Sequence, residues 1–180
     1  MRIIVLDTLK PGFHGGSFCK ERANWLSKTL EEQPEKPTLI ALHHPPIDTG
    51  IPWMTTSFDA PWVTRFRNVI SSHNNIIQII SGHVHRRISK PFANSYVCVS
   101  GAIAPQVKLD LSPIVPTVPD GRILLIDGPA EYCLHQWDGK SLTTHSSITP
   151  AGKPIVHFDK EHAFIVPQTL DLNPKKTILD

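Results

Sequence analysis

Residues 38–46, TLIALHHPP, place a short apolar run directly before two histidines and two prolines. The uncharged run over 38–42 is typical of a strand buried on both faces of a sheet. A second stretch, IIQIISGHVH at residues 76–85, repeats the arrangement, with an apolar strand over 76–80 that leads into a glycine and two histidines. In α/β sheets ligands collect beyond the carboxyl ends of strands, so these histidines are predicted to meet at one edge.

The sequence around these strands predicts helices first and strands alone later. Arg2–Leu6 is a β-branched run that predicts another buried strand. Residues 21–32 predict an amphipathic helix with Trp25, Leu26 and Leu30 on its apolar side, and a second helix is predicted over 59–73. Further strands are predicted over 95–100, 122–127, 131–137 and 141–145, with Asp138-Gly139 as a hairpin turn between the last two. The pattern indicates an α/β fold with a strand-rich second half, arranged as a layered sandwich.

Composition and charge exclude several classes of protein. At 180 residues, with 40% hydrophobic and 19% charged residues, the chain has the size and composition of one globular domain. A net charge of +2 gives no broad surface for nucleic acid, so no nucleic-acid partner is expected. No apolar run approaches the roughly 20 residues of a membrane-spanning helix. Three widely spaced cysteines indicate neither a disulfide framework nor a cysteine zinc site. We therefore expect a cytoplasmic protein without a membrane partner.

Three histidines are candidate metal ligands. His43 follows the first strand, and His83 and His85 follow the second. At strand period, one intervening residue sends the His83 and His85 side chains to the same side, and Gly82 allows a close approach of backbone or ligand. Neutral imidazole suits zinc, iron, nickel and copper, and it serves manganese in mixed sites. The alternative is that these histidines are ordinary turn residues.

Other residues near this edge are candidates for supporting roles at the site. His44 either packs in the interior or orients His43. His14, in a glycine-rich loop, is the one further histidine with a place near the candidate site. Residues 50–62 and 102–119 are predicted to form loops near the metals. Trp53 and Trp62 in the first of these loops either stack on a base or belong to the core.

Two motifs carry a resemblance to a known family. The segments Leu42-His43-His44-Pro45-Pro46 and Ser81-Gly82-His83-Val84-His85 resemble the two C-terminal motifs of calcineurin-like metallophosphoesterases. The similarity is to the bacterial branch that contains cyclic-nucleotide and glycerophosphodiester phosphodiesterases. Three further segments resemble stretches of that branch: Val5-Leu6-Asp7-Thr8 with the glycines of residues 12–16, Trp25-Leu26, and Leu111-Ser112-Pro113.

The resemblance implies a fold and a reaction. Residues 1–147 would be the C-terminal part of a four-layer α-β-β-α sandwich, and residues 148–180 a tail for packing or dimerisation. The family implies two divalent metals, iron, manganese or zinc, and a bridging hydroxide that attacks phosphorus. The implied substrate is a small-molecule phosphodiester, either a cyclic nucleotide or a glycerophosphodiester.

The motifs also carry residue roles onto this chain. By resemblance, His43 and His83 would bind one metal and His85 the other. His44 and Gly82 would lie behind the ligands or beside the substrate. No residue of the chain is assigned as catalytic.

The family's N-terminal motifs do not occur in this sequence. These motifs are an Asp-x-His, a Gly-Asp that carries the bridging carboxylate, and an Asn-His-Asp or Asn-His-Glu. Three histidines would leave two cations short of ligands. We therefore expect a truncated chain with an incomplete site that is inactive in isolation. The alternative is an inactive remnant that serves as a binding module or forms a homo-oligomer.

Overall fold

The chain forms two compact units, Met1–Pro150 and Ala151–Asp180. The computed structural model describes residues 1–163 and 165–166. The elements described below lie in the first unit. The predicted tail, residues 148–180, belongs mainly to the second unit, and its residues 164 and 167–180 lie outside the described part of the chain. Among the described residues, no helix combines the length and apolarity needed to cross a membrane.

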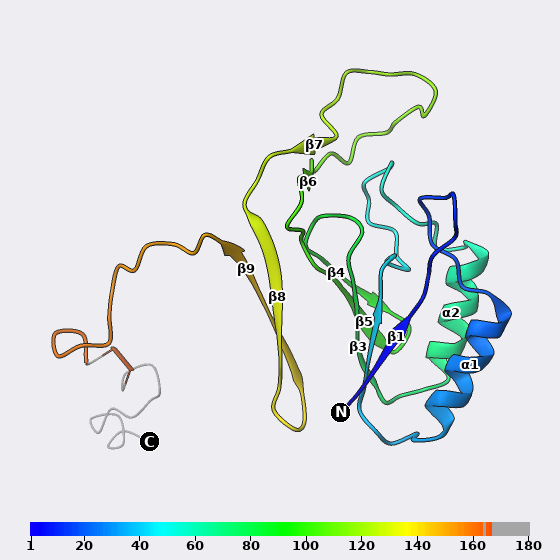
Figure 1. Cartoon of the computed structure of the whole chain (residues 1–180), viewed down its shortest axis with the longest axis horizontal. Helices are drawn as coiled ribbons and strands as arrows, with labels where there is room; N and C mark the ends of the chain where they lie inside the picture. Colours follow the sequence, from blue (N-terminus) through cyan, green and yellow to red (C-terminus); the bar gives the residue numbers. More distant parts are fainter. Residues whose placement is uncertain (164, 167–180) are drawn as a thin grey trace, which may run out of the picture. The chain divides into compact units, whose positions relative to one another are not determined.

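A five-stranded sheet forms the centre of the first unit (Figure 1). Its order is β1 (Arg2–Leu6), β2 (Thr38–Leu42), β3 (Ile76–Ser81), β5 (Ser95–Val99) and β4 (Ile88–Phe92). Strands β1, β2, β3 and β5 pair in parallel, whereas β4 pairs antiparallel with β5. The α/β class is therefore confirmed, and the carboxyl ends of β2 and β3 lie side by side, as the sequence predicts.

Strand β4 is not predicted by the sequence. It contains Pro91, which cannot donate a backbone hydrogen bond and therefore argues against a central strand. The structure places β4 at the edge of the sheet, where only β5 pairs with it. An edge position tolerates proline, so the tertiary arrangement makes a strand that the local sequence disfavours.

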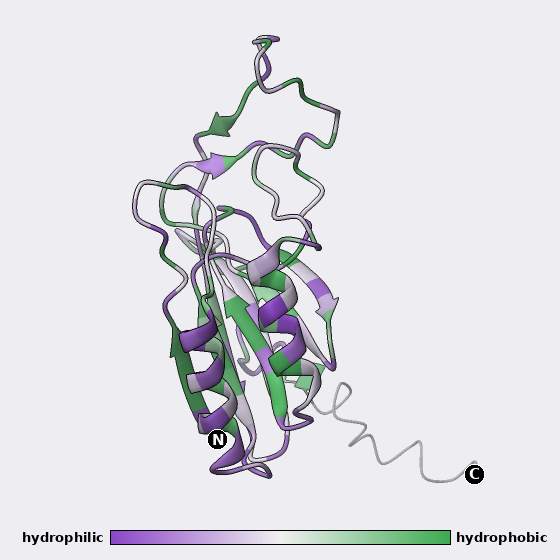
Figure 2. Cartoon of the chain, turned by 90° about the vertical axis from the view of Figure 1, so that its right-hand side faces the viewer, coloured by the Kyte–Doolittle hydropathy of each residue, from purple (hydrophilic) through white to green (hydrophobic). Residues whose placement is uncertain are grey.

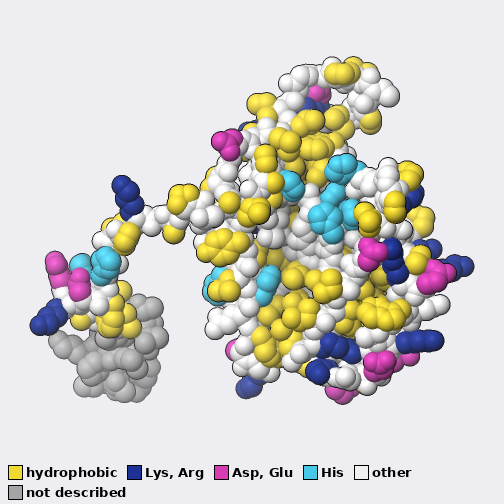
Figure 3. Space-filling view, in the orientation of Figure 1, with side chains coloured by type: hydrophobic (Ala, Val, Ile, Leu, Met, Phe, Trp, Pro, Cys, Tyr) yellow, Lys and Arg dark blue, Asp and Glu magenta, His cyan; other side chains and the backbone are white. Residues whose placement is uncertain are grey.

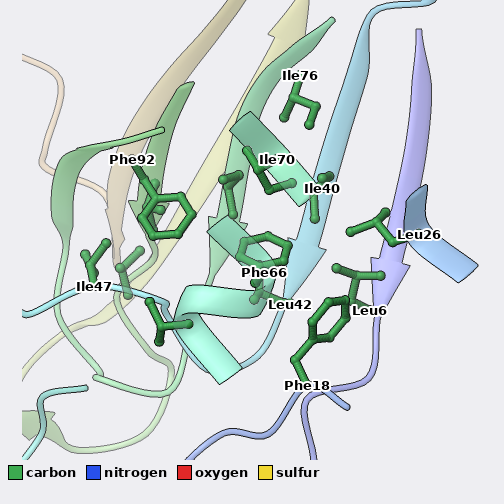
Figure 4. Packing of buried hydrophobic residues seen from close by; sticks show 14 of the residues in the cluster. Leu6, Phe18, Leu26, Ile40, Leu42, Ile47, Phe66, Ile70, Ile76 and Phe92 are labelled. Atoms are coloured by element: carbon green, nitrogen blue, oxygen red, sulfur yellow. The ribbon is translucent and has the colours of Figure 1, made fainter. Parts of the chain in front are cut away.

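Helices α1 (Lys20–Glu31) and α2 (Pro61–Ser71) cover one face of the sheet, and Figure 2 shows their polar residues turned outward. Leu26 of α1 and Phe66 of α2 are fully buried. They belong to one apolar cluster with Ile40 of β2, which Figure 4 shows from close by. Each large side chain buried in this way contributes about 1.5–3 kcal/mol to stability.

The prediction that Trp25 lies on the buried side of α1 is wrong. Trp25 is 52% exposed, although its neighbour Leu26 is fully buried. The buried residues of α1 are Ala23, Leu26 and Leu30, which follow the helical repeat. Trp25 lies about a quarter of a turn away from Leu26, outside this narrow stripe.

A hairpin of β8 (Ala130–Trp137) and β9 (Leu142–Thr149) forms a separate two-stranded sheet, which lies on the side of the central sheet away from the helices (Figure 1). Its turn contains Asp138-Gly139, as predicted. The side chains of Gln78 in β3 and Thr144 in β9 are hydrogen bonded at 3.2 Å. The hairpin is therefore linked to β3 by a polar contact.

Part of the sheet remains uncovered in the described chain. Ile3 and Val5 of β1 are 59% and 74% exposed, while Ile4 and Leu6, which alternate with them, are buried. Alternate residues of a strand point to opposite faces, so β1 is buried only on its helix side.

The predicted strand over 122–127 is reduced to β7 (Leu125–Ile126), which pairs with β6 (Gln106–Val107).

Candidate metal centre

Two loops at the carboxyl edge of the sheet bring histidines together. One loop follows β2 and begins with His43 and His44, and the other follows β3 and carries Gly82 and His83. The Gly82 N–H donates to the His43 carbonyl oxygen at 3.1 Å, so the loops are joined at their first residues. A Cβ at position 82 would lie 3.9 Å from His43 Nδ1, an ordinary contact distance. The structure thus shows no steric need for glycine at position 82.

The backbone at His83 and His85 is left-handed. Their φ angles are 68° and 53°, and Val84 between them is fully buried. Left-handed conformations are unfavourable for residues with a Cβ and cost on the order of 1–3 kcal/mol each. The segment is a bend and not a strand, so the argument from strand period does not apply to it.

His43, His44 and His83 form a compact group. One ligand nitrogen from each lies within 4.8 Å of the other two. The closest pair is His83 Nδ1 and His43 Nε2, at 3.2 Å. The His14 ring lies 5.4 Å from that of His83, at the border of the group. Figure 3 shows histidine side chains gathered in a patch at this end of the first unit.

Thr8 holds His44 in the group. The Thr8 hydroxyl and His44 Nδ1 lie 2.8 Å apart, and both residues are buried. The His44 backbone N–H donates to the same hydroxyl at 3.4 Å. A hydrogen bond with the His14 backbone also holds the His44 ring. The sequence pattern alone assigns Thr8 no role, although its position two residues after β1, at the same sheet edge, is a usable signal.

Gly16 allows this close packing. A Cβ at position 16 would lie 2.8 Å from His44 Cβ and 3.0 Å from the Trp62 ring. Neither atom is the end of a flexible side chain, so a larger residue would displace His44 or the loop. Trp62 therefore supports the site through packing, because its ring lies on Gly16 and against the core.

His85 lies outside the three-histidine group. Its Nδ1–H donates to the Pro105 carbonyl oxygen at 2.8 Å, because a carbonyl can only accept. The lone pair of His85 is consequently on Nε2. Residues 102–119 thus contribute to the site by orienting His85.

His83 and His44 favour the neutral form. Burial, together with the neighbouring His44 and His43, lowers the pKa of His83 from its ordinary value of 6.5 to about 4. Burial also lowers the pKa of His44. Metals bind neutral imidazole, so these shifts keep the lone pairs available near neutral pH.

The chemistry of this donor set fits one divalent ion. Three protein ligands with a further position left open are typical of catalytic zinc, and imidazole also suits iron, copper and nickel. Among the described residues, the group contains no carboxylate. Two ions held by a bridging anion would need ligands beyond these three.

Two hollows adjoin the group. One, of about 310 Å³, is lined by His14, Gly15, His44, Pro45, Trp53, Met54, Thr55, Thr56 and His83. The other, of about 450 Å³, lies beside Leu9, Gly12 and Phe13 and shares the histidines. The site thus has space next to the imidazoles for a small molecule.

Comparison with known proteins identifies relatives for most of the described chain. No family model matches it. A probable glycerophosphodiester phosphodiesterase from Arcobacter nitrofigilis is 30% identical over 82% of this chain and 52% of its own length. A probable cyclic nucleotide phosphodiesterase from Rhodopseudomonas palustris is 30% identical over 81% of this chain and 57% of its own. A cAMP/cGMP dual specificity phosphodiesterase from Mycobacterium tuberculosis is 31% identical over 57% of this chain and 31% of its own. The chain spans about half the length of the first two relatives.

Among solved structures, a dimetal phosphatase from Danio rerio aligns at a TM-score of 0.37 and 19% identity. The alignment covers 48% of this chain and 27% of that one. The assignment of the chain to a family rests on the sequence relatives.

Proposed function

Because the chain belongs to the calcineurin-like metallophosphoesterases, in their cyclic-nucleotide and glycerophosphodiester phosphodiesterase branch, we propose that it provides the histidine side of a metal-dependent phosphodiesterase centre. The observation that carries the proposal is the group of His43, His44 and His83 at the carboxyl edge of the sheet. The proposed substrate is a small phosphodiester, and the proposed ligands are His43 and His83 for one ion and His85 for another.

A divalent ion in this site would polarise a phosphoryl oxygen and activate water near neutral pH. The residues of the chain do the positioning. Thr8 fixes the His44 ring, and Pro105 fixes the His85 ring through Nδ1. Burial of His83 keeps its imidazole neutral and able to bind.

We propose that hydrolysis also requires carboxylate ligands that the histidine group lacks. Negative ligands are what hold two cations close together, and three neutral imidazoles leave their positive charge uncompensated. A second copy of the chain, or a longer polypeptide, would supply them. The proposal therefore predicts metal binding by the chain alone and hydrolysis only when the ligand set is completed.

The test is the hydrolysis of bis(p-nitrophenyl) phosphate by the purified chain with Mn(II) or Fe(II), over a range of chain concentrations. Activity that rises more steeply than in proportion to concentration, and that His83→Ala abolishes, is the result expected if a second copy completes the site. The His145→Ala variant, altered at an exposed position of β9, is the matched control. Activity that persists in His83→Ala contradicts the proposal.

A second candidate function is a binding or oligomerising module without catalysis. It is supported by the exposed Ile3 and Val5 of β1 and by a hollow of about 380 Å³ that Val5 shares with Ala41, His43 and Ile80. Exposed apolar strand faces commonly mark interaction surfaces. Light scattering across concentrations tests this function, and a chain that is monomeric throughout counts against a homo-oligomer.

A further inference from the structure

We propose that the hollow beside Trp53 and Met54, hereafter the Trp53 pocket, binds a nucleobase. The inference rests on the proposed function and deepens it, since it selects cyclic nucleotides over glycerophosphodiesters as the substrate class. The Trp53 pocket has a volume of about 310 Å³ and adjoins His44 and His83 directly. That volume is at the lower end for ligand sites, which suits a single ring system.

The wall of the Trp53 pocket is a built structure. The Met54 N–H donates to the Ile51 carbonyl at 3.0 Å, and the Thr49 hydroxyl donates to the Met54 carbonyl at 3.2 Å. Ile51 is 1% exposed, and Trp53 and Met54 themselves pack against the core cluster. The loop therefore holds the Trp53 indole in place before a ligand arrives, which lowers the entropy lost on binding.

The chemistry of the Trp53 pocket favours an aromatic ligand. Trp53, Met54 and Pro45 present an indole, a thioether and a pyrrolidine ring. Flat π-systems stack on indole, and sulfur makes favourable contacts with aromatic rings. A glycerol moiety would exchange the hydration of its hydroxyls for these apolar surfaces, which is unfavourable. Thr56 also lines the pocket, whereas the Thr55 hydroxyl is engaged with Asp48 and with the Thr49 N–H.

The Trp53 pocket lies next to the place where a phosphate would bind at the histidines. His44 and His83 line the pocket as well as the metal group, so a phosphodiester at the imidazoles would have its base directed towards Trp53. The second hollow is less suitable. Its aromatic residue, Phe13, is 63% exposed, and the Lys10 ammonium already lies 3.7 Å from the centre of its ring.

Adenosine is the probe that tests the inference, because it contains the base and no phosphate and needs no metal. We expect saturable binding of adenosine to the metal-free chain by ligand-observed NMR, and no comparable binding of glycerol. Trp53→Ala should weaken adenosine binding about tenfold, as loss of a base-stacking residue does. Trp53→Phe should retain most of the affinity, since an aromatic ring remains. Trp25→Ala, at an exposed position of α1, should change nothing.

Two results overturn the inference: no saturable adenosine binding up to about 10 mM, or binding that Trp53→Ala leaves unchanged in a variant with wild-type circular dichroism. If the Trp53→Ala chain does not fold, the adenosine affinities of Trp53→Phe and Met54→Ala are measured in its place. The inference then requires that Met54→Ala binds adenosine more weakly than the wild type. The proposed function fails separately. Adenosine binding without any metal binding contradicts only the phosphodiesterase proposal, and metal-dependent hydrolysis without adenosine binding contradicts only the nucleobase pocket.

Discussion

At the scale of single residues, the centre depends on contacts that join distant parts of the sequence. The positions of His43 and His83 could be predicted, because each lies within two residues of the end of a buried strand in one parallel sheet. The place of His44 could not, since it depends on Thr8, 36 residues earlier. The strand period expected for His83 and His85 does not hold, because the backbone is left-handed on both sides of Val84.

The left-handed backbone at His85 predicts an unusual order of stabilities. His85→Gly should be more stable than His85→Ala by about 1 kcal/mol, because glycine has no Cβ to clash at a φ of 53°. Urea unfolding of the two variants measures the difference. The same pair at Lys28, exposed in α1, should show the reverse order, with glycine about 1 kcal/mol less stable. Equal stabilities at position 85 would contradict the conformation described.

The close packing around Gly16 gives a second prediction at this scale. Gly16→Ala should destabilise the chain by about 1–3 kcal/mol, because its Cβ would overlap His44 and Trp62. It should also weaken metal binding, since the His44 ring contacts the rings of His43 and His83 and would displace them. Gly15→Ala is the matched control, because a Cβ there meets nothing within 4 Å. If Gly16→Ala and Gly15→Ala have the same melting temperature and the same zinc affinity, the close packing described around Gly16 is contradicted.

The lowered pKa of His83 predicts a pH dependence of stability. Between pH 4 and 6.5 the unfolded chain binds a proton that the folded chain excludes, so the free energy of unfolding should rise with pH across this window. Above pH 6.5 both states hold a neutral imidazole and this contribution is constant. Urea titrations of the metal-free chain should show a shallower rise for His83→Asn. If the free energy of unfolding rises as steeply with pH in His83→Asn as in the wild type, the pH dependence comes from other groups.

At the scale of the elements, the repeat of apolar residues predicted both helices and the strands that carry the site. What it could not predict depends on neighbours. Strand β4 forms because it pairs with β5 at the edge of the sheet, where Pro91 is tolerated. Trp25 is exposed because the buried stripe of α1 is narrow, although the residue is among the most apolar of the helix.

Adjacent residues of α1 provide the prediction at this scale. Leu26→Ala should cost about 2–5 kcal/mol, because it leaves a cavity where the side chain is fully buried. Trp25→Ala should cost less than about 1 kcal/mol, since half of that side chain is in water. Chemical unfolding of both variants measures the two values. A larger loss for Trp25→Ala would mean that the helix is rotated relative to the sheet.

At the scale of the whole molecule, the first unit combines a helix-covered sheet with an imidazole site at one edge. The first two relatives are probable phosphodiesterases, of which the chain matches about half the length. The sheet face of β1 is exposed at Ile3 and Val5, and the histidine group contains no carboxylate among the described residues. These features support a chain that contributes one side of a metal centre and presents an apolar surface to whatever completes it.

The most direct test of this account is the number of zinc ions that the purified chain retains after equilibrium dialysis. We expect about one ion per chain, held at His43 and His83, because the second ion, at His85, needs the carboxylate ligands that the group lacks. His83→Ala should lose it, whereas His145→Ala should retain it. A chain that retains no zinc, or a His83→Ala variant that retains as much as the wild type, would contradict the metal centre.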